Sequence, residues 1–245
     1  MNNRNALFVV IEGVDGSGKG TQSKMLAERL RKEHYRTTLL SFPRYRETEG
    51  GKLVGKYLDG QLRGMEDADP RVKALIFTLD RVESRPLLEA HLQVDDVVIC
   101  DRYVLSNVAH QAAFWKGSER CLAGSVVEQE RREFCSWLED LEFDRLGMPK
   151  ADLTFVFDLP VDQAQMLIAK KLGRSYTAKA ADLHEADTDY LKKVRQAYRQ
   201  VAEHPGRNHG RVGQIGLMRN GHVKDPKTIH EQVYETVKCL LPRTA

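Results

Sequence analysis

The chain has 245 residues, 41% of them hydrophobic, and its 38 basic and 35 acidic side chains leave a net charge of +3. A chain of this length can bury one substantial core, so we expect a single domain over residues 1–245. The small, dispersed charge argues against a nucleic-acid surface, and the apolar runs are too short for a membrane span or a signal peptide.

The cysteines indicate a reducing compartment. Cys100, Cys121, Cys135 and Cys239 form no C-x-x-C pair and have no metal-ligand spacing. We interpret them as reduced thiols. We therefore expect a soluble, cytoplasmic protein with no nucleic-acid or membrane partner.

Short apolar strands alternate with longer helical patterns along the chain. The expected strands are residues 6–13, 36–43, 95–103 and 151–160, with a weaker fifth within 212–221. Helical spacing of apolar residues is found in 20–34, 187–202 and 227–241. This alternation predicts an α/β fold with a doubly wound parallel sheet of about five strands, whose ligands bind beyond the carboxyl ends of the strands. Residues 117–133 look like a surface excursion with a charged helix, and 204–213 like a polar loop.

The first strand ends in a glycine-rich turn, GVDGSGKGT, that opens a helix. This order of strand, loop and helix directs backbone N–H groups at a phosphate chain, and Lys19 would reach the terminal phosphates. The alternative is a tight glycine turn with an exposed lysine. The predicted nucleotide-binding residues are Gly13, Val14, Asp15, Gly16, Ser17, Gly18, Lys19, Gly20 and Thr21.

The loop departs from the usual phosphate-loop pattern at Gly20, where a Ser or Thr hydroxyl normally helps to hold magnesium. Thr21 lies next to this position, and magnesium keeps several waters in most nucleotide sites, so a carboxylate acting through water can share the task. Asp101, at the end of the third strand, is the candidate carboxylate, and Arg102 could bind a second phosphate group. An ordinary salt bridge at a strand end is the alternative for this pair.

Five segments resemble the thymidylate kinase family in their order and approximate spacing, and together they span most of the chain: EGVDGSGKGTQ, FPRYRET, LIFTLDR, DRYVLSNVAHQ and GRSYTAKAADLHEADTDYLKKVRQAY. The resemblance implies a P-loop nucleoside monophosphate kinase with a mobile lid at about residues 170–186. It implies transfer of the γ-phosphoryl group of ATP to dTMP with Mg²⁺, giving dTDP and ADP for dTTP biosynthesis, by a homodimeric enzyme. A kinase of another nucleotide or deoxynucleoside, and a P-loop ATPase or switch that is not a kinase, stay open as alternatives.

The resemblance also implies an acceptor site. Phe77 matches the aromatic residue that stacks on thymine, Arg81 the arginine that binds a base carbonyl, and Asn107 the amide at the pyrimidine edge. Without the resemblance, Phe77 would be a core residue and Asn107 a turn residue. His110 stands where relatives often carry an aromatic residue that crowds the sugar 2′ position, so sugar discrimination stays open.

Two charged residues complete the match on the acceptor side. Arg102 matches the arginine that holds the acceptor phosphate, and Asp15 the acid near the sugar 3′-hydroxyl and the metal. Of Arg44 and Arg46, we favour Arg44 as a second phosphate ligand. The predicted acceptor-binding set is Asp15, Phe42, Pro43, Arg44, Phe77, Arg81, Arg102, Asn107, His110 and Tyr176. The predicted metal-binding acids are Asp15 and Asp101, acting through water.

The catalytic charge is expected outside the phosphate loop. Some members of the family place an arginine in the loop, but the corresponding residue here is Gly16, which directs attention to the lid. The lid candidates are Lys170, Lys171, Arg174 and Lys179, of which we choose Arg174. The predicted catalytic residues are Lys19, Arg174, Asp15 and Arg102. A solvated basic loop is the alternative for this segment.

Overall fold

The structure of the protein is a computed structural model that describes residues 6–65, 67–115, 124–172, 187–204, 206 and 208–241. Its helices and strands, in chain order, are β1 (Leu7–Gly13), α1 (Lys19–Lys32), β2 (Thr37–Ser41), α2 (Glu49–Leu58), α3 (Pro70–Val94), β3 (Val97–Asp101), α4 (Val104–Ala113), α5 (Gly124–Glu139), the π-helical η1 (Asp140–Arg145), β4 (Leu153–Asp158), α6 (Val161–Leu172), α7 (Thr188–Glu203), β5 (Arg211–Gly216), β6 (Met218–Arg219), β7 (His222–Val223) and α8 (Pro226–Lys238).

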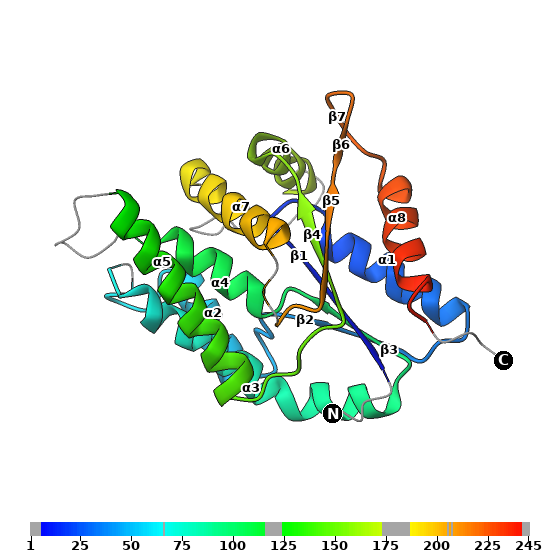
Figure 1. The fold of residues 1–245 in the computed structure, drawn as a ribbon, viewed down its shortest axis with the longest axis horizontal. Helices are drawn as coiled ribbons and strands as arrows, with labels where there is room; N and C mark the ends of the chain where they lie inside the picture. The colour runs from blue at the N-terminus through cyan, green and yellow to red at the C-terminus, as the bar shows by residue number, and fades with distance from the viewer. Residues whose placement is uncertain are drawn as a thin grey trace.

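Five parallel strands form the central sheet in the order β2-β3-β1-β4-β5, and β6 and β7 form a separate antiparallel hairpin. Helices α1 and α8 lie on one side of this sheet, and α3, α4 and α7 lie on the other (Figure 1). Because β1 is central and covered on both faces, its residues after Leu7 are all buried. The register aligns Ile11 of β1 with Asp101 of β3, so the phosphate loop and the end of β3 lie together at the carboxyl end of the sheet.

Local sequence signals explain where several helices begin. The Thr48 side chain accepts a hydrogen bond from the Gly51 N–H group at the start of α2. Asp69, Asp187 and Asp225 accept hydrogen bonds in the same way at the starts of α3, α7 and α8. Such caps satisfy N–H groups that have no partner within the helix.

The predicted α/β fold with a five-stranded parallel sheet is confirmed. The apolar stripe predicted on 187–202 is also confirmed, because Tyr190, Leu191, Val194, Ala197 and Tyr198 are all buried on α7. The expected polar loop over 204–213 differs in part from the structure. Its Asn208 and His209 are 3% exposed and hydrogen-bond the Glu139 carboxylate at the end of α5.

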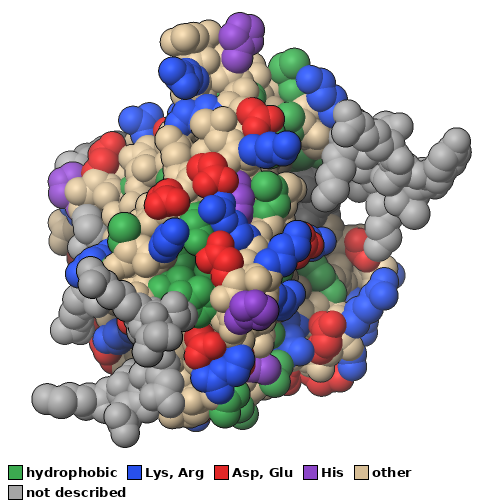
Figure 2. Space-filling view, turned by 90° about the vertical axis from the view of Figure 1, so that its right-hand side faces the viewer, with side chains coloured by type: hydrophobic (Ala, Val, Ile, Leu, Met, Phe, Trp, Pro, Cys, Tyr) green, Lys and Arg blue, Asp and Glu red, His purple; other side chains and the backbone are tan. Residues whose placement is uncertain are grey.

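Charged side chains are mixed on the face of the molecule that Figure 2 shows, which is the side of α1 and α8 in Figure 1. Lysines and arginines alternate there with aspartates and glutamates and do not gather into a patch of one sign. Among the described helices, none combines the length and the apolar composition needed to cross a membrane.

Candidate functional site

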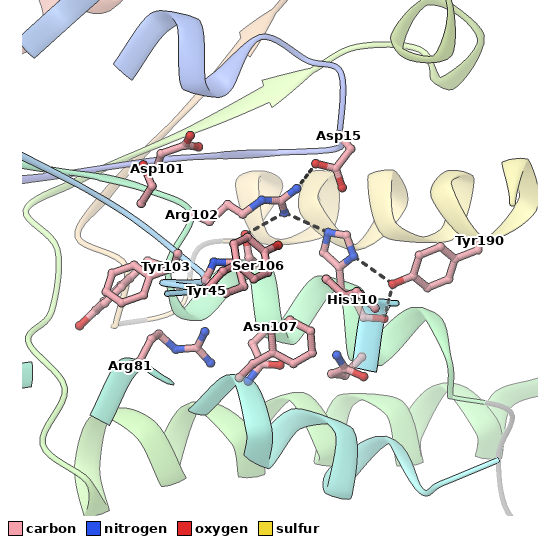
Figure 3. Close-up of a pocket in the computed structure, with 16 residues that line it drawn as sticks. Asp15, Tyr45, Arg81, Asp101, Arg102, Tyr103, Ser106, Asn107, His110 and Tyr190 are labelled. Carbon is pink, nitrogen blue, oxygen red and sulfur yellow. Dashed lines mark hydrogen bonds and ion pairs between the residues drawn. The ribbon is translucent and has the colours of Figure 1, made fainter. Parts of the chain in front are cut away.

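A cavity of about 380 Å³ opens beyond the carboxyl ends of β1, β2 and β3. Figure 3 shows that its side chains come from the phosphate loop, from the segment after β2, and from α3, α4 and α7. Its lining consists of Asp15, Ser41, Phe42, Pro43, Tyr45, Leu58, Phe77, Arg81, Asp101, Arg102, Tyr103, Ser106, Asn107, His110, Gln111 and Tyr190. This position, at an edge where parallel strands end, is where open α/β sheets bind ligands.

The phosphate loop has the geometry expected of an anion site. Helix α1 begins at Lys19 directly after Gly18, and no described side chain caps it, so its first N–H groups are available to a phosphate. Lys19 is 6% exposed, and its Nζ donates to the Val14 carbonyl oxygen at 3.0 Å and lies 3.7 Å from Asp15 Oδ1. Burial lowers the pKa of Lys19, Arg102 adds to that effect, and Asp15 opposes it.

Gly16 is held against helix α6. Its φ is +80°, and a Cβ atom at this position would lie 2.4 Å from the Ala164 carbonyl oxygen and 2.9 Å from Ile168 Cγ1. A side chain therefore has no room there unless α6 moves. In addition, residues other than glycine rarely adopt this φ. The packing gives a structural reason why this loop carries no arginine at Gly16.

Gly20 lies next to the carboxylate predicted for the metal region. A Cβ atom on Gly20 would be 2.9 Å from Asp101 Oδ2, so the bare glycine lets Asp101 approach the start of α1. Asp101 Oδ1 is buried and has no hydrogen-bond partner in the described part of the chain. An unsatisfied carboxylate oxygen beside a phosphate loop suits a hydrated Mg²⁺. The described residues contain no group of three or more His, Cys, Asp and Glu side chains that could hold a metal on their own.

The guanidinium of Arg102 joins two other predicted site residues. It forms an ion pair with Asp15, and its Nη1 lies 3.3 Å from His110 Nε2 (Figure 3). His110 Nδ1 lies 2.9 Å from the Tyr190 hydroxyl. Burial raises the pKa of Asp15, but Arg102, Lys19 and His110 outweigh it and hold that pKa well below its usual range. Asp15 is therefore ionised near neutral pH.

The predicted base-binding residues are also brought together. Arg81 is 2% exposed and Asn107 is 2% exposed, yet both line the cavity. Both are held by Glu142, which accepts hydrogen bonds from Arg81 Nε at 2.6 Å, Arg81 Nη2 at 2.5 Å and Asn107 Nδ2 at 3.0 Å. Phe77 is only half-buried and contacts Tyr57 edge to face, with ring centroids 6.2 Å apart. Its position on the cavity wall differs from that of a fully buried core phenylalanine.

The segment after β2 contributes Phe42, Pro43 and Tyr45 to the cavity wall. Arg44 is not part of the lining, and its Nη1 donates to the Ser84 hydroxyl on α3 at 3.3 Å. The role of Arg44 in phosphate binding stays a prediction. Asp80 of α3 fixes the position of this segment, because its carboxylate accepts hydrogen bonds from the Arg44 N–H group and the Thr48 hydroxyl.

Several residues that shape the site were not predicted from the sequence. Glu12 is fully buried and accepts hydrogen bonds from the N–H groups of Tyr103 and Ser106, which fixes the start of α4. Glu142 has no motif around it, and its partners Arg81 and Asn107 are distant in sequence. The only sign of the role of Glu142 in the sequence is that a charged residue stands within an otherwise amphipathic segment.

The predicted lid falls mostly outside the described residues. Lys170 is exposed near the end of α6. Arg174, Tyr176 and Lys179, and the side chain of Lys171, lie outside the described part of the chain.

Comparisons with known proteins agree on one family. The family model described as thymidylate kinase matches residues 11–209. A probable thymidylate kinase of Thermococcus kodakarensis is 31% identical over 240 residues, which cover 96% of this chain and 98% of that protein. The thymidylate kinase of Mycobacterium tuberculosis is 28% identical over 198 residues, covering 80% and 86%. A solved structure of thymidylate kinase from Candida albicans has the same fold, with a TM-score of 0.70 at 21% identity over 98% of this chain and 94% of that one.

Proposed function

Because the chain belongs to the thymidylate kinase family, which phosphorylates dTMP to dTDP, we propose that it transfers the γ-phosphoryl group of Mg-ATP to dTMP. One observation supports this most directly. A single cavity contains an aromatic side chain, a buried arginine and amide, and a second arginine, directly beside the phosphate loop. A protein that only bound or hydrolysed ATP would not need this second, acceptor-sized site next to its loop.

On the donor side, the phosphate loop and the first N–H groups of α1 bind the ATP phosphates, with Lys19 at the terminal ones. Asp15 and Asp101 would hold a magnesium ion through water, an assignment supported by the unpartnered Asp101 Oδ1. Magnesium, bound to the ATP phosphates, would neutralise charge that develops on them during transfer.

On the acceptor side, Arg102 binds the dTMP phosphate, which requires its guanidinium to turn from Asp15 toward the substrate. Phe77 stacks on the thymine ring, while Arg81 and Asn107 bind its polar edge. His110 and Asp15 lie on the sugar side, near the 2′ and 3′ positions. Phe42 and Pro43 form part of the cavity wall, and Arg44 and Tyr176 are further candidates for acceptor binding.

The remaining catalytic charge comes from Arg174 in a lid over about residues 170–186 of a single kinase domain. Transfer of a phosphoryl group spreads negative charge over its oxygens, and an arginine placed there contributes about a thousandfold or more. The close packing of Gly16 against α6 supports a source outside the loop.

We further propose a homodimer in the cytoplasm. Val72, Leu75 and Leu79 are between 39% and 48% exposed along one face of α3, a spacing that suits pairing with a second copy. Leu75→Asp should give a monomer in light scattering coupled to gel filtration, while wild type gives a dimer. A wild-type monomer would refute this assembly. Cys100, Cys135 and Cys239 are free thiols, which suits a reducing compartment.

An acceptor panel tests the activity itself. ADP release would be measured with ATP and each of dTMP, dUMP, dCMP, dGMP, UMP and thymidine. The proposal predicts the highest kcat/KM with dTMP. A different preferred acceptor would identify another nucleotide or deoxynucleoside kinase, and ATP hydrolysis that ignores all acceptors would identify a P-loop ATPase or switch.

A further inference from the structure

Glu142 holds two residues of the base-binding part of the cavity, although it does not line the cavity itself. It lies on η1, is fully buried, and receives hydrogen bonds from Arg81, Asn107 and the Thr78 hydroxyl, the last at 2.9 Å. These three donors come from α3 and α4, so one carboxylate ties two helices at the site together. Burial lowers the pKa of Arg81, but the Glu142 carboxylate more than offsets this and keeps the guanidinium charged.

The contact with Glu142 is one of three that orient the Asn107 amide. Asn107 Nδ2 points to three acceptors: Glu142 Oε1, the Ala74 carbonyl oxygen at 3.1 Å and the Thr78 hydroxyl oxygen at 3.3 Å. A reversed amide would place its oxygen against a carboxylate and a carbonyl, which repel it. Asn107 Oδ1 is buried and has no partner among the described residues, which leaves an unsatisfied acceptor on a residue that lines the cavity.

Glu142 similarly limits which nitrogen of the Arg81 guanidinium can donate to a ligand. Because Nε and Nη2 of Arg81 bind Glu142, Nη1 is the nitrogen left for a ligand. The residues that line the cavity therefore include a charged donor, Arg81 Nη1, and a neutral acceptor, Asn107 Oδ1. Figure 3 shows Arg81 and Asn107 in the same part of the cavity.

This donor and acceptor match one class of pyrimidine. Thymine and uracil carry a carbonyl oxygen at position 4 and an N–H group at position 3, which are an acceptor beside a donor. Cytosine carries an amino group and a bare ring nitrogen at these positions, so its pattern is reversed. A site whose buried polar groups cannot pair with a ligand discriminates strongly against it.

We propose that Glu142 is a positioning residue that sets this hydrogen-bond polarity and so makes the site select a thymine or uracil base over cytosine. The inference rests on the proposed function, in which Arg81 and Asn107 contact the base. It adds that the selectivity depends on a carboxylate that the substrate never touches.

Glu142→Gln tests the proposal, with kcat and KM measured for dTMP, dCMP and ATP. A glutamine keeps one acceptor oxygen and replaces the other with an amino group, so it cannot accept hydrogen bonds from Arg81 and Asn107 as the carboxylate does, and both side chains lose part of what fixes their orientation. We expect the KM for dTMP to rise by about tenfold or more, and the ratio of kcat/KM for dCMP to that for dTMP to rise by about tenfold. The KM for ATP should stay within about twofold of wild type, since its site is separate.

Glu139→Gln is the matched control. Glu139 lies one turn before Glu142 and also accepts hydrogen bonds from buried partners, Asn208 and His209, but these lie away from the base site. Its ratio of dCMP to dTMP activity should equal that of wild type. Equal losses of kcat/KM for dTMP and for ATP in both variants, with an unchanged ratio of dCMP to dTMP activity, would show a purely structural role and overturn the proposal.

A second variant covers the case in which Glu142→Gln does not fold, because it leaves the Arg81 charge buried without a counter-charge. Thr78→Val removes a donor to Glu142 and an acceptor of Asn107 but keeps the ion pair. It should shift the dCMP to dTMP ratio a few-fold in the same direction, and an unchanged ratio overturns the proposal. Wild-type protein that does not phosphorylate dTMP would instead overturn the proposed function, and this inference with it.

Discussion

Replacement of Phe77 by alanine separates base binding from general stability. The Phe77 ring is half-buried on α3, contacts Tyr57 edge to face and lines the cavity. Loss of a fully buried phenylalanine costs about 3–5 kcal/mol of stability, and a ring that already faces a cavity should cost less. Stacking of a base on an aromatic ring contributes about 1–3 kcal/mol. We therefore expect the KM for dTMP to rise by about 5- to 150-fold.

The assay is steady-state kinetics with dTMP and ATP varied in turn, together with a thermal melt of each variant. The KM for ATP should stay close to wild type, because Phe77 lies on the acceptor side of the cavity. Phe77→Leu is the matched control: it retains most of the apolar volume but has no aromatic face, so it should melt near wild type and still bind dTMP poorly. Equal loss of dTMP and ATP binding, or a normal KM for dTMP in Phe77→Leu, would refute the stacking role and favour a core role.

Three further predictions concern the loop, the lid and pH. Gly16→Ala places a Cβ atom 2.4 Å from the Ala164 carbonyl oxygen at a φ of +80°, so it should lower the melting temperature and weaken ATP binding. A thermal melt would show a lower midpoint and a smaller upward shift on addition of ATP. Arg174→Ala should lower kcat by about a thousandfold with little change in the KM for dTMP; near-normal turnover in single-turnover experiments would move the role to another lid residue. Because the folded-state pKa of Asp15 is depressed, chiefly by Arg102 acting against burial, its contribution to stability is complete above its unfolded pKa of about 3.9 and is lost as the pH falls through the folded value. Asp15→Asn should flatten this acid part of the profile in denaturant unfolding, and an unchanged profile would contradict the assignment.

The sheet could be predicted because its strands are short apolar runs that end at glycine, proline or charged residues. β1 ends at Gly13 and β2 ends two residues before Pro43, close to where the sequence pattern stops. The stripe on α7 was equally clear, since its apolar residues recur at helical spacings of three and four residues. In these elements, the local pattern and the tertiary burial impose the same requirement on the sequence.

The residues that hold the site in place could not be predicted in the same way. Glu142 and Asn208 are polar, and polar residues without a motif look like solvent-exposed positions. Their burial depends on partners that are distant along the chain, such as Arg81 for Glu142 and Glu139 for Asn208. Pairings of this kind leave no periodic signal, because each is a single contact between unrelated segments.

The contact between the phosphate loop and α6 has a consequence for how this enzyme could change. Gly16 packs against the backbone of α6, and α6 leads directly into the segment predicted to be the lid. A variant that acquired an arginine at Gly16 would push this helix away before it gained any catalytic benefit. Because the closest contact is with the Ala164 carbonyl group, which no substitution at that position removes, an arginine could enter the loop only if the backbone of α6 shifted as well.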